Sequence, residues 1–234
     1  MDRVRDFFDR SAESYQALEA GMSPYHRVTA AAIEEGLVGD VLSLGGLWAD
    51  AGERRDGIRM VVADLSLSML AMLPPGIGLR AVCDGRLPAF AEESFDHSVL
   101  PLILHHVTDR TFSSARAGAT RVLEQVRSLA RPGATLWISD FCTGFLVYAL
   151  QRLCAPLTGR LLGLVGEPLV IMHSAAFYRQ ALAASGWTEI SIQPIAAPDA
   201  KAWDLLRPVI AAPWLRLPRW AYPLQPTLIR ATAG

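Results

Sequence analysis

The chain has 234 residues, with 22 basic and 23 acidic side chains, a formal net charge of −1 and a hydrophobic fraction of 51%. This charge balance gives no electrostatic support to a nucleic-acid partner, while a mean hydropathy of +0.25 predicts a large apolar core, an apolar ligand site or an apolar contact surface. The three cysteines have no CxxC spacing and no histidine cluster, which argues against a metal site or a disulfide framework and fits a reducing cytoplasm.

Targeting segments are not expected. The first fifteen residues, MDRVRDFFDRSAESY, are too charged for a signal peptide. The most apolar stretch, 141–165, is interrupted by Arg152 and Arg160, so it lacks the run of about 18 apolar residues that a membrane span needs. We therefore expect no membrane span and a cytoplasmic location.

The chain opens with two expected helices. Residues 2–20 carry apolar side chains at near-helical spacing, and 23–35 form a second helix that ends at Gly36, a residue favoured after helix C-termini. These helices make up an N-terminal segment, 1–36.

Short apolar strands then alternate with helices. Expected strands cover 40–44, 60–64, 79–84, 95–104 and 135–140, and expected helices cover 66–73 and 116–130. Continuous apolar strands separated by helices indicate a parallel sheet covered on both faces, so 37–140 is the predicted core.

The pattern becomes irregular after residue 140. We expect an apolar helical insertion at 141–174, a helix at 175–185, a strand at 187–194, a Pro- and Trp-rich insertion at 197–226 and a last strand at 227–232. The insertions suit a lid over an apolar pocket or a homodimer interface, and a membrane surface is disfavoured because no basic face is evident.

Several segments in order resemble the class I S-adenosylmethionine (SAM) methyltransferases, especially those acting on small molecules. The segments are FFDRSAESY, VADLSLSML, CDGRLPAFAEESFD, LHHV, VRSLARPGATLWISDF and FYRQALAASGW. Each is weakly diagnostic alone, but their order covers nearly the whole chain. The resemblance implies one α/β domain, 1–234, with a Rossmann-like seven-stranded, mostly parallel sheet, helices on both faces and helical lid insertions.

The resemblance also implies which residues bind SAM. Asp64 ends the second strand, where the family's acid contacts the ribose hydroxyls, and Asp84 follows the third strand, where the family's acid faces the adenine. The alternative for each acid is capping of the next helix or turn. The expected cofactor-binding residues are Gly45, Gly46, Asp64, Leu65, Asp84, Gly85 and Leu100.

The glycine-rich loop departs from the family pattern of acid-x-Gly-x-Gly-x-Gly. Ser43 stands at the acid, and only Gly45 matches a glycine, because Leu47 and Ala49 occupy the other two positions and Trp48 lies between them. Side chains at these positions take space where backbone would approach the methionine part of SAM. We therefore expect SAM binding to be impaired or altered in pose.

Candidate catalytic residues are His105, His106, Tyr15 and His173. The two adjacent histidines follow the fourth strand, at the rim where an acceptor would lie, and one of them is a candidate base, whereas the alternative is that they shape the loop. Tyr15 belongs to the helix that covers the cofactor in relatives, and His173 ends the first insertion. Packing or a surface position is the alternative for both, and no metal site is expected.

Three functions remain open. The first is a SAM-dependent methyltransferase for an apolar small molecule such as a secondary metabolite. The second is an enzyme of the same fold that no longer transfers methyl, of the cyclase or pericyclase type, with or without SAM. The third is a non-catalytic pseudo-methyltransferase partner, and the fold by itself does not choose among them.

Overall fold

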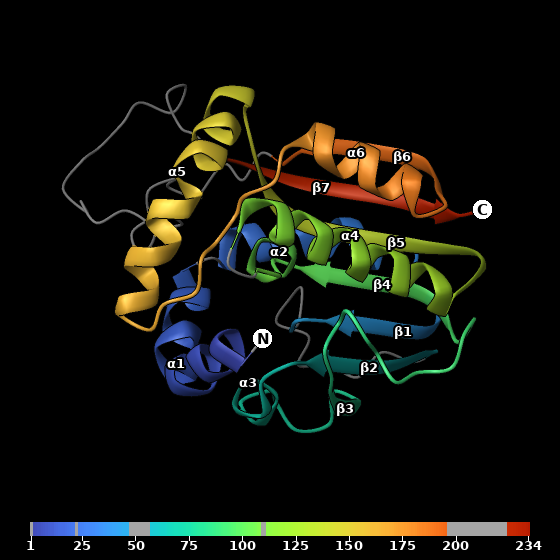
Figure 1. Cartoon of the computed structure of the whole chain (residues 1–234). Coiled ribbons are helices and arrows are strands. Elements are labelled where there is room, and N and C mark those ends of the chain that lie inside the picture. Colours follow the sequence, from blue (N-terminus) through green and yellow to red (C-terminus); the bar gives the residue numbers. More distant parts are fainter. Residues whose placement is uncertain (1, 22, 47–56, 109–110, 196–223) are drawn as a thin grey trace.

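The computed structural model of the chain describes residues 2–21, 23–46, 57–108, 111–195 and 224–234 (Figure 1). Within these residues a seven-stranded sheet has the order β3-β2-β1-β4-β5-β7-β6. The strands are β1 (Gly39–Leu44), β2 (Ile58–Asp64), β3 (Leu79–Val82), β4 (Phe95–Pro101), β5 (Ala130–Thr143), β6 (Trp187–Pro194) and β7 (Leu224–Ala233).

The first five strands run parallel, and β7 is antiparallel to both of its neighbours. Val41 of β1 lies opposite Met60 of β2, and Ile138 of β5 lies opposite Ile229 of β7. The predicted seven-stranded, mostly parallel α/β sheet is confirmed, with β6 and β7 forming its antiparallel edge.

Helices cover both faces of this sheet. They are α1 (Asp2–Gly21), α2 (Ser23–Glu34), α3 (Leu67–Ala71), α4 (Phe112–Leu129), α5 (Phe145–Leu164) and α6 (Ala175–Ala184), with a 3-10 turn η1 (Leu104–His106) after β4. Residues of α2 pack with Val41 and Val99 on one face, where α3 also packs against β2. On the other face α4 and α6 pack against the alternate strand residues, among them Leu100 and Leu136. Because both faces are covered, the strands read as apolar runs in the sequence.

Several elements differ in length from the sequence expectation. Strand β4, for example, ends at Pro101 rather than at 104, and the 3-10 turn η1 follows it. Helix α4 begins at Phe112 rather than at 116, because Thr111 and Ser114 form a reciprocal capping box before it. Strand β5 covers 130–143 rather than 135–140, because it pairs with β4 at its beginning and with β7 as far as Thr143.

Two helices lie beyond the carboxyl ends of the parallel strands, at the left in Figure 1. Helix α1 is tied to the start of α3, because the Ser66 hydroxyl donates to the Asp9 carboxylate over 2.5 Å. Helix α5 occupies the predicted apolar insertion. None of the described helices combines the length and the hydropathy needed to cross a membrane.

Candidate active site

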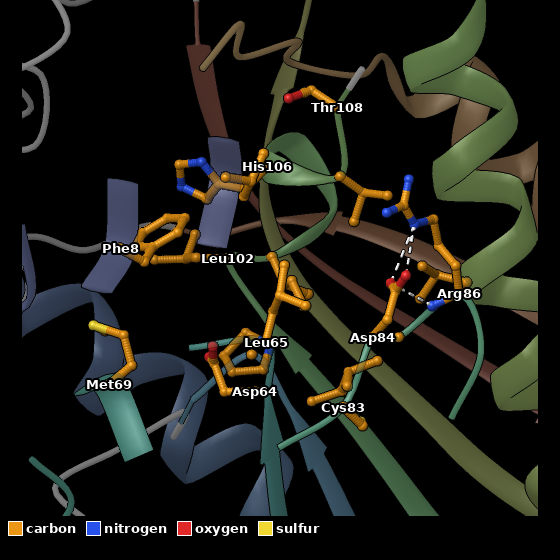
Figure 2. A pocket seen from close by; sticks show the side chains of 18 residues that line it. Phe8, Asp64, Leu65, Met69, Cys83, Asp84, Arg86, Leu102, His106 and Thr108 are labelled. Carbon is orange, nitrogen blue, oxygen red and sulfur yellow. Dashed lines mark hydrogen bonds and ion pairs between the residues drawn. The ribbon is translucent and has the colours of Figure 1, made fainter. Parts of the chain in front are cut away.

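A cavity lies at the carboxyl ends of β1, β2, β3 and β4, under α1 (Figure 2). It has a volume of about 820 Å³, part of which is open to solvent. Most of its wall is apolar, and its lining residues extend along the chain from Val4 and Phe8 of α1 to Val122 of α4. The parallel strands thus place the loops that follow them around one hollow, as the ligand sites of open α/β sheets are placed.

The loop after β1 approaches the loop after β4 very closely. Gly45 has φ +91°, and a Cβ atom there would lie 2.5 Å from Cδ1 of Ile103. Its amide donates to the carbonyl of Ala63 over 2.7 Å. Both the backbone conformation and the contact require glycine at this position.

Of the loop residues that follow Gly45, only Gly46 is described. Gly46 has φ +120° and open space where a Cβ would stand, and it is not among the residues that line the cavity. Its carbonyl accepts a hydrogen bond from the Ser43 hydroxyl, so Ser43 serves the turn itself. Leu47, Trp48 and Ala49 lie outside the described residues.

Asp64 is the acid that ends β2, and its carboxylate lines the cavity together with Leu65 (Figure 2). One oxygen accepts the backbone amide of Ser66 over 2.7 Å. Burial raises the pKa of this carboxyl to about 6, and the nearby Asp9 adds to the shift. A ligand that donates hydroxyl groups to this carboxylate would offset its desolvation.

Asp84 follows β3 and already has a cationic partner inside the cavity. The Nε atom of Arg86 lies 3.1 Å from one oxygen of Asp84 and 3.3 Å from the other, and the Arg86 amide also donates to Asp84. Gly85 lies between them and packs on Leu44, where an added Cβ would lie 2.9 Å from Cδ2. Asp84 and Gly85 therefore line the cavity, but the carboxylate of Asp84 is held by Arg86.

The two adjacent histidines of η1 have different surroundings. His106 lines the cavity, and its ring contacts the edge of Phe8 with ring centroids 5.0 Å apart. Burial, and then the charge of His105, lower the pKa of His106 well below its usual value. The His106 imidazole is therefore neutral at pH 7, and a neutral ring can accept or donate a proton.

His105 does not line the cavity and instead contacts a buried acid. Its Nδ1 lies 2.6 Å from Oδ1 of Asp140, while the Tyr178 hydroxyl donates to Oδ2 over 2.5 Å and the Phe141 amide donates to Oδ1 over 2.7 Å. Burial would raise the pKa of Asp140, but the neighbouring His105 and these hydrogen bonds hold it below its usual value. Asp140 thus stays ionised behind the cavity wall.

The remaining predicted residues lie away from the cavity or cannot be placed. His173 is buried and stacks on Phe177 with ring centroids 4.2 Å apart, and burial lowers the pKa of His173 to about 4. Leu100 lies in the core and does not line the cavity. Tyr15 belongs to α1, but its side chain is outside the description.

The structure adds cavity residues that the sequence did not indicate. Leu102 is a buried non-glycine residue at φ +52°, a backbone conformation that leucine rarely adopts, and it lies at the cavity wall. Phe8 belongs to a segment that resembles the family, but nothing in the segment marked that side chain. Among the described residues no group of three or more potential ligands could hold a metal ion.

Known structures have a similar fold. The cyclase SpnF is 11% identical, with a TM-score of 0.69 over 99% of this chain and 95% of that chain. A SAM-dependent methyltransferase from Thermotoga maritima is 14% identical, with a TM-score of 0.62 over 99% of this chain and 100% of that chain. Geranyl diphosphate C-methyltransferase from Streptomyces coelicolor A3(2) is 13% identical, with a TM-score of 0.59 over 88% of this chain and 75% of that chain.

No protein-family model and no curated protein sequence matches the chain. The likeness therefore lies in the fold. This is the class I SAM-dependent methyltransferase fold, which the cyclase also has.

Proposed function

We propose that this protein is a SAM-dependent methyltransferase that acts on an apolar small molecule such as a secondary metabolite. The observation that carries the proposal is the Asp64 carboxylate, which faces the cavity at the end of β2 while burial raises its pKa to about 6. A half-buried carboxylate that has lost part of its solvation favours a ligand with hydroxyl donors, and the ribose of SAM offers two.

The described residues fit SAM. Asp64 and Leu65 would hold the ribose side, while Gly45 and Gly85 line the same cavity, Gly45 against Ile103 and Gly85 against Leu44. When bound, SAM supplies an electrophilic methyl group on a sulfonium. The neighbouring apolar wall, with Phe8 and Leu102, would hold an apolar acceptor and exclude water.

His106 is the group we assign to proton transfer. Its neutral ring lies at the cavity wall and can take up a proton from the acceptor. Because burial lowers its pKa, the ring is a weak base, which favours an acceptor whose proton is acidic. The three free thiols of Cys83, Cys142 and Cys154 suit the expected cytoplasmic location. Cys83 lines the cavity, but burial raises the pKa of its thiol to about 11, so it is a poor nucleophile.

Titration calorimetry with SAM and with S-adenosylhomocysteine tests the proposal. The wild type should bind both, and Asp64→Ala should weaken binding by about tenfold or more, because a charge-assisted hydrogen bond is lost. Glu124→Ala is the matched control, because Glu124 is an exposed carboxylate on α4 away from the cavity. Absence of binding to the wild type would exclude methyl transfer.

A triple variant tests the loop that departs from the family pattern. Leu47→Gly, Trp48→Thr and Ala49→Gly together should strengthen binding of SAM if those side chains obstruct it. No change in a wild type that already binds tightly would show that the loop is no obstacle.

A second candidate is a cyclase-type enzyme that transfers no methyl group. The observation in its favour is that Arg86 already holds the Asp84 carboxylate, the acid expected at the adenine, inside a largely apolar cavity. Release of S-adenosylhomocysteine with an apolar acceptor distinguishes the two candidates. A ring closure that proceeds without this release would support the cyclase.

A further inference from the structure

Helix α5 is apolar on two opposite sides. Its inner side packs on the domain: Ala155 is buried, Tyr148 contacts the edge of Phe112 with ring centroids 5.0 Å apart, and the Gln151 side chain makes two hydrogen bonds with the backbone of Met172. These contacts fix which side of the helix faces outward.

The outer side carries six exposed leucines. Leu164 is 83% exposed and Leu161, the least exposed, is 55% exposed. The six lie three or four positions apart, which places them in one stripe along the helix. The stripe consists of Leu146, Leu150, Leu153, Leu157, Leu161 and Leu164. At 100° per residue it lies roughly opposite Gln151 and Ala155, and an apolar stripe of this length is normally covered.

The charges around this stripe are mainly basic. Helix α5 contains Arg152 and Arg160, both exposed, and no acidic residue. From α1, the Arg10 guanidinium reaches the carbonyl of Gly166 just beyond the end of α5. Two acids of α1 have partners of their own, since Asp9 bonds with Ser66, and Asp6 with Arg5, whereas Glu13 of the same helix is exposed.

Glu167 is an exposed acid three positions beyond the last residue of the helix. Within α5 itself, the charged residues are Arg152 and Arg160, so the helix carries only positive charge. That charge is complementary to anionic phosphate groups, whereas a second copy of the same helix would offer no acid to these arginines.

The sequence disfavoured a membrane surface for this insertion, but the exposed leucines and the two arginines of α5 lead us to propose that its outer face docks on an anionic lipid surface. A 20-residue helix is about 30 Å long and would lie in the plane of the interface, with the leucines in the acyl boundary and the arginines at the phosphates. None of the described helices can span a bilayer, which suits such a helix lying flat.

The position of α5 in the fold relates its outer face to the cavity. Helices α5 and α1 both lie beyond the carboxyl ends of the parallel strands, and α1 forms part of the cavity wall (Figure 1). Docking through α5 would hold the end of the sheet that carries the apolar cavity near the bilayer, which is the phase where a strongly apolar molecule is most concentrated. The inference does not depend on methyl transfer, since it concerns only the outer face of α5.

Co-sedimentation with vesicles, done with the full chain and no SAM, tests the proposal. Vesicles of phosphatidylcholine mixed with phosphatidylglycerol should bind the protein, and vesicles of phosphatidylcholine alone should bind it less. Leu153→Ser with Leu157→Ser should weaken binding by about tenfold or more, because two apolar side chains no longer enter the interface. Arg152→Glu with Arg160→Glu should remove the preference for anionic vesicles, and salt should weaken the wild type.

The matched control is Leu79→Ser with Val82→Ser, two equally exposed apolar residues on the edge strand β3. Its binding should equal that of the wild type. Absence of binding to anionic vesicles, or equal binding by the α5 leucine variant, overturns the proposal. If the wild type does not bind vesicles and is a dimer that the α5 leucine variant converts to a monomer, the outer face of α5 is assigned to a second copy of the chain. If instead the α5 leucine variant has a lower melting temperature than the wild type, the face is assigned to contact with another part of the chain.

Discussion

Two carboxylates of the sheet have opposite environments, although the sequence places each of them after a run of apolar residues. Asp64 is the last residue of β2, and Asp140 lies within β5. Asp140 of β5 is fully buried and accepts hydrogen bonds from Tyr178 and the Phe141 amide, besides its contact with His105. Asp64 of β2 faces the cavity and accepts an amide of its own turn. The pKa of Asp140 lies below its usual value, whereas burial raises that of Asp64 to about 6.

The difference teaches how to separate structural from ligand-binding acids in this fold. Asp140 obtains every partner from within the protein, so its charge stabilises the interior and holds η1 in place through His105. Asp64 is desolvated without a cation to compensate, and it therefore retains the capacity to bind a donor from outside. Stability and binding measurements should separate the two.

The largest expected effect is on stability, from Asp140→Ala. Removing the carboxylate leaves His105 and the Tyr178 hydroxyl buried without their partner, and should lower the free energy of unfolding by about 3–5 kcal/mol. Denaturant unfolding measures the change. A decrease in the free energy of unfolding of less than about 1 kcal/mol would mean that Asp140 contributes little to stability, and it would contradict the contrast with Asp64.

Asp64→Asn should raise the free energy of unfolding at pH 7, whereas Asp140→Ala lowers it. The folded protein binds a proton at Asp64 below about pH 6, and the unfolded chain only near the usual value of 3.8. The stability due to Asp64 is thus fully present below pH 3.8 and lost as the pH rises through 6, so the variant should be more stable than the wild type at pH 7 by about 1–3 kcal/mol.

This advantage of Asp64→Asn should disappear as the pH falls to 4, which thermal unfolding across this pH range would measure. Asp140 has the reverse dependence, because its pKa is lowered, and its stabilisation is lost only as the pH falls below 3.8. An advantage of the Asn variant that is constant with pH would refute the assigned cause.

The smallest expected effect concerns the pair of Asp84 and Arg86. The environment of Asp84 is intermediate, because it has a cationic partner, unlike Asp64, but is partly exposed, unlike Asp140. A double-mutant cycle with Asp84→Asn and Arg86→Gln should give a coupling free energy of about 0.5–1 kcal/mol, because solvent screens part of the attraction. The cycle is read from denaturant unfolding. A coupling free energy as large as that of a buried ion pair would mean that Asp84 is a structural acid like Asp140 and not a ligand-binding acid like Asp64.

The sequence predicted the sheet well because its strands are covered on both sides and so form continuous apolar runs. Helix α4 was placed four residues late, since its start depends on the capping hydroxyls of Thr111 and Ser114 rather than on apolar spacing. The length of β5 depends on its pairing with β4 and β7, which no local pattern contains.

The candidate site was predictable only as far as strand ends define it. Asp64 ends β2, and Asp84 and His106 lie two and five residues beyond the ends of β3 and β4, so the fold brings all three to one cavity. The sequence could not separate His106 from His105, because adjacent residues point in different directions from a single 3-10 turn. Nor could it show the Arg86 side chain folding back on Asp84, or the left-handed backbone of Leu102.

The close approach of Gly45 to Ile103 sets a rule for redesigning the cavity. A side chain added at 45 meets the wall at 103, and the backbone there accepts only glycine, so mutational libraries should leave 45 constant and vary 103. Shortening Ile103 to valine or alanine would enlarge the hollow beside the β1 loop without altering that loop's conformation. Homologues that accept bulkier ligands should accordingly be sought among sequences with a small residue at 103 and an unchanged glycine at 45.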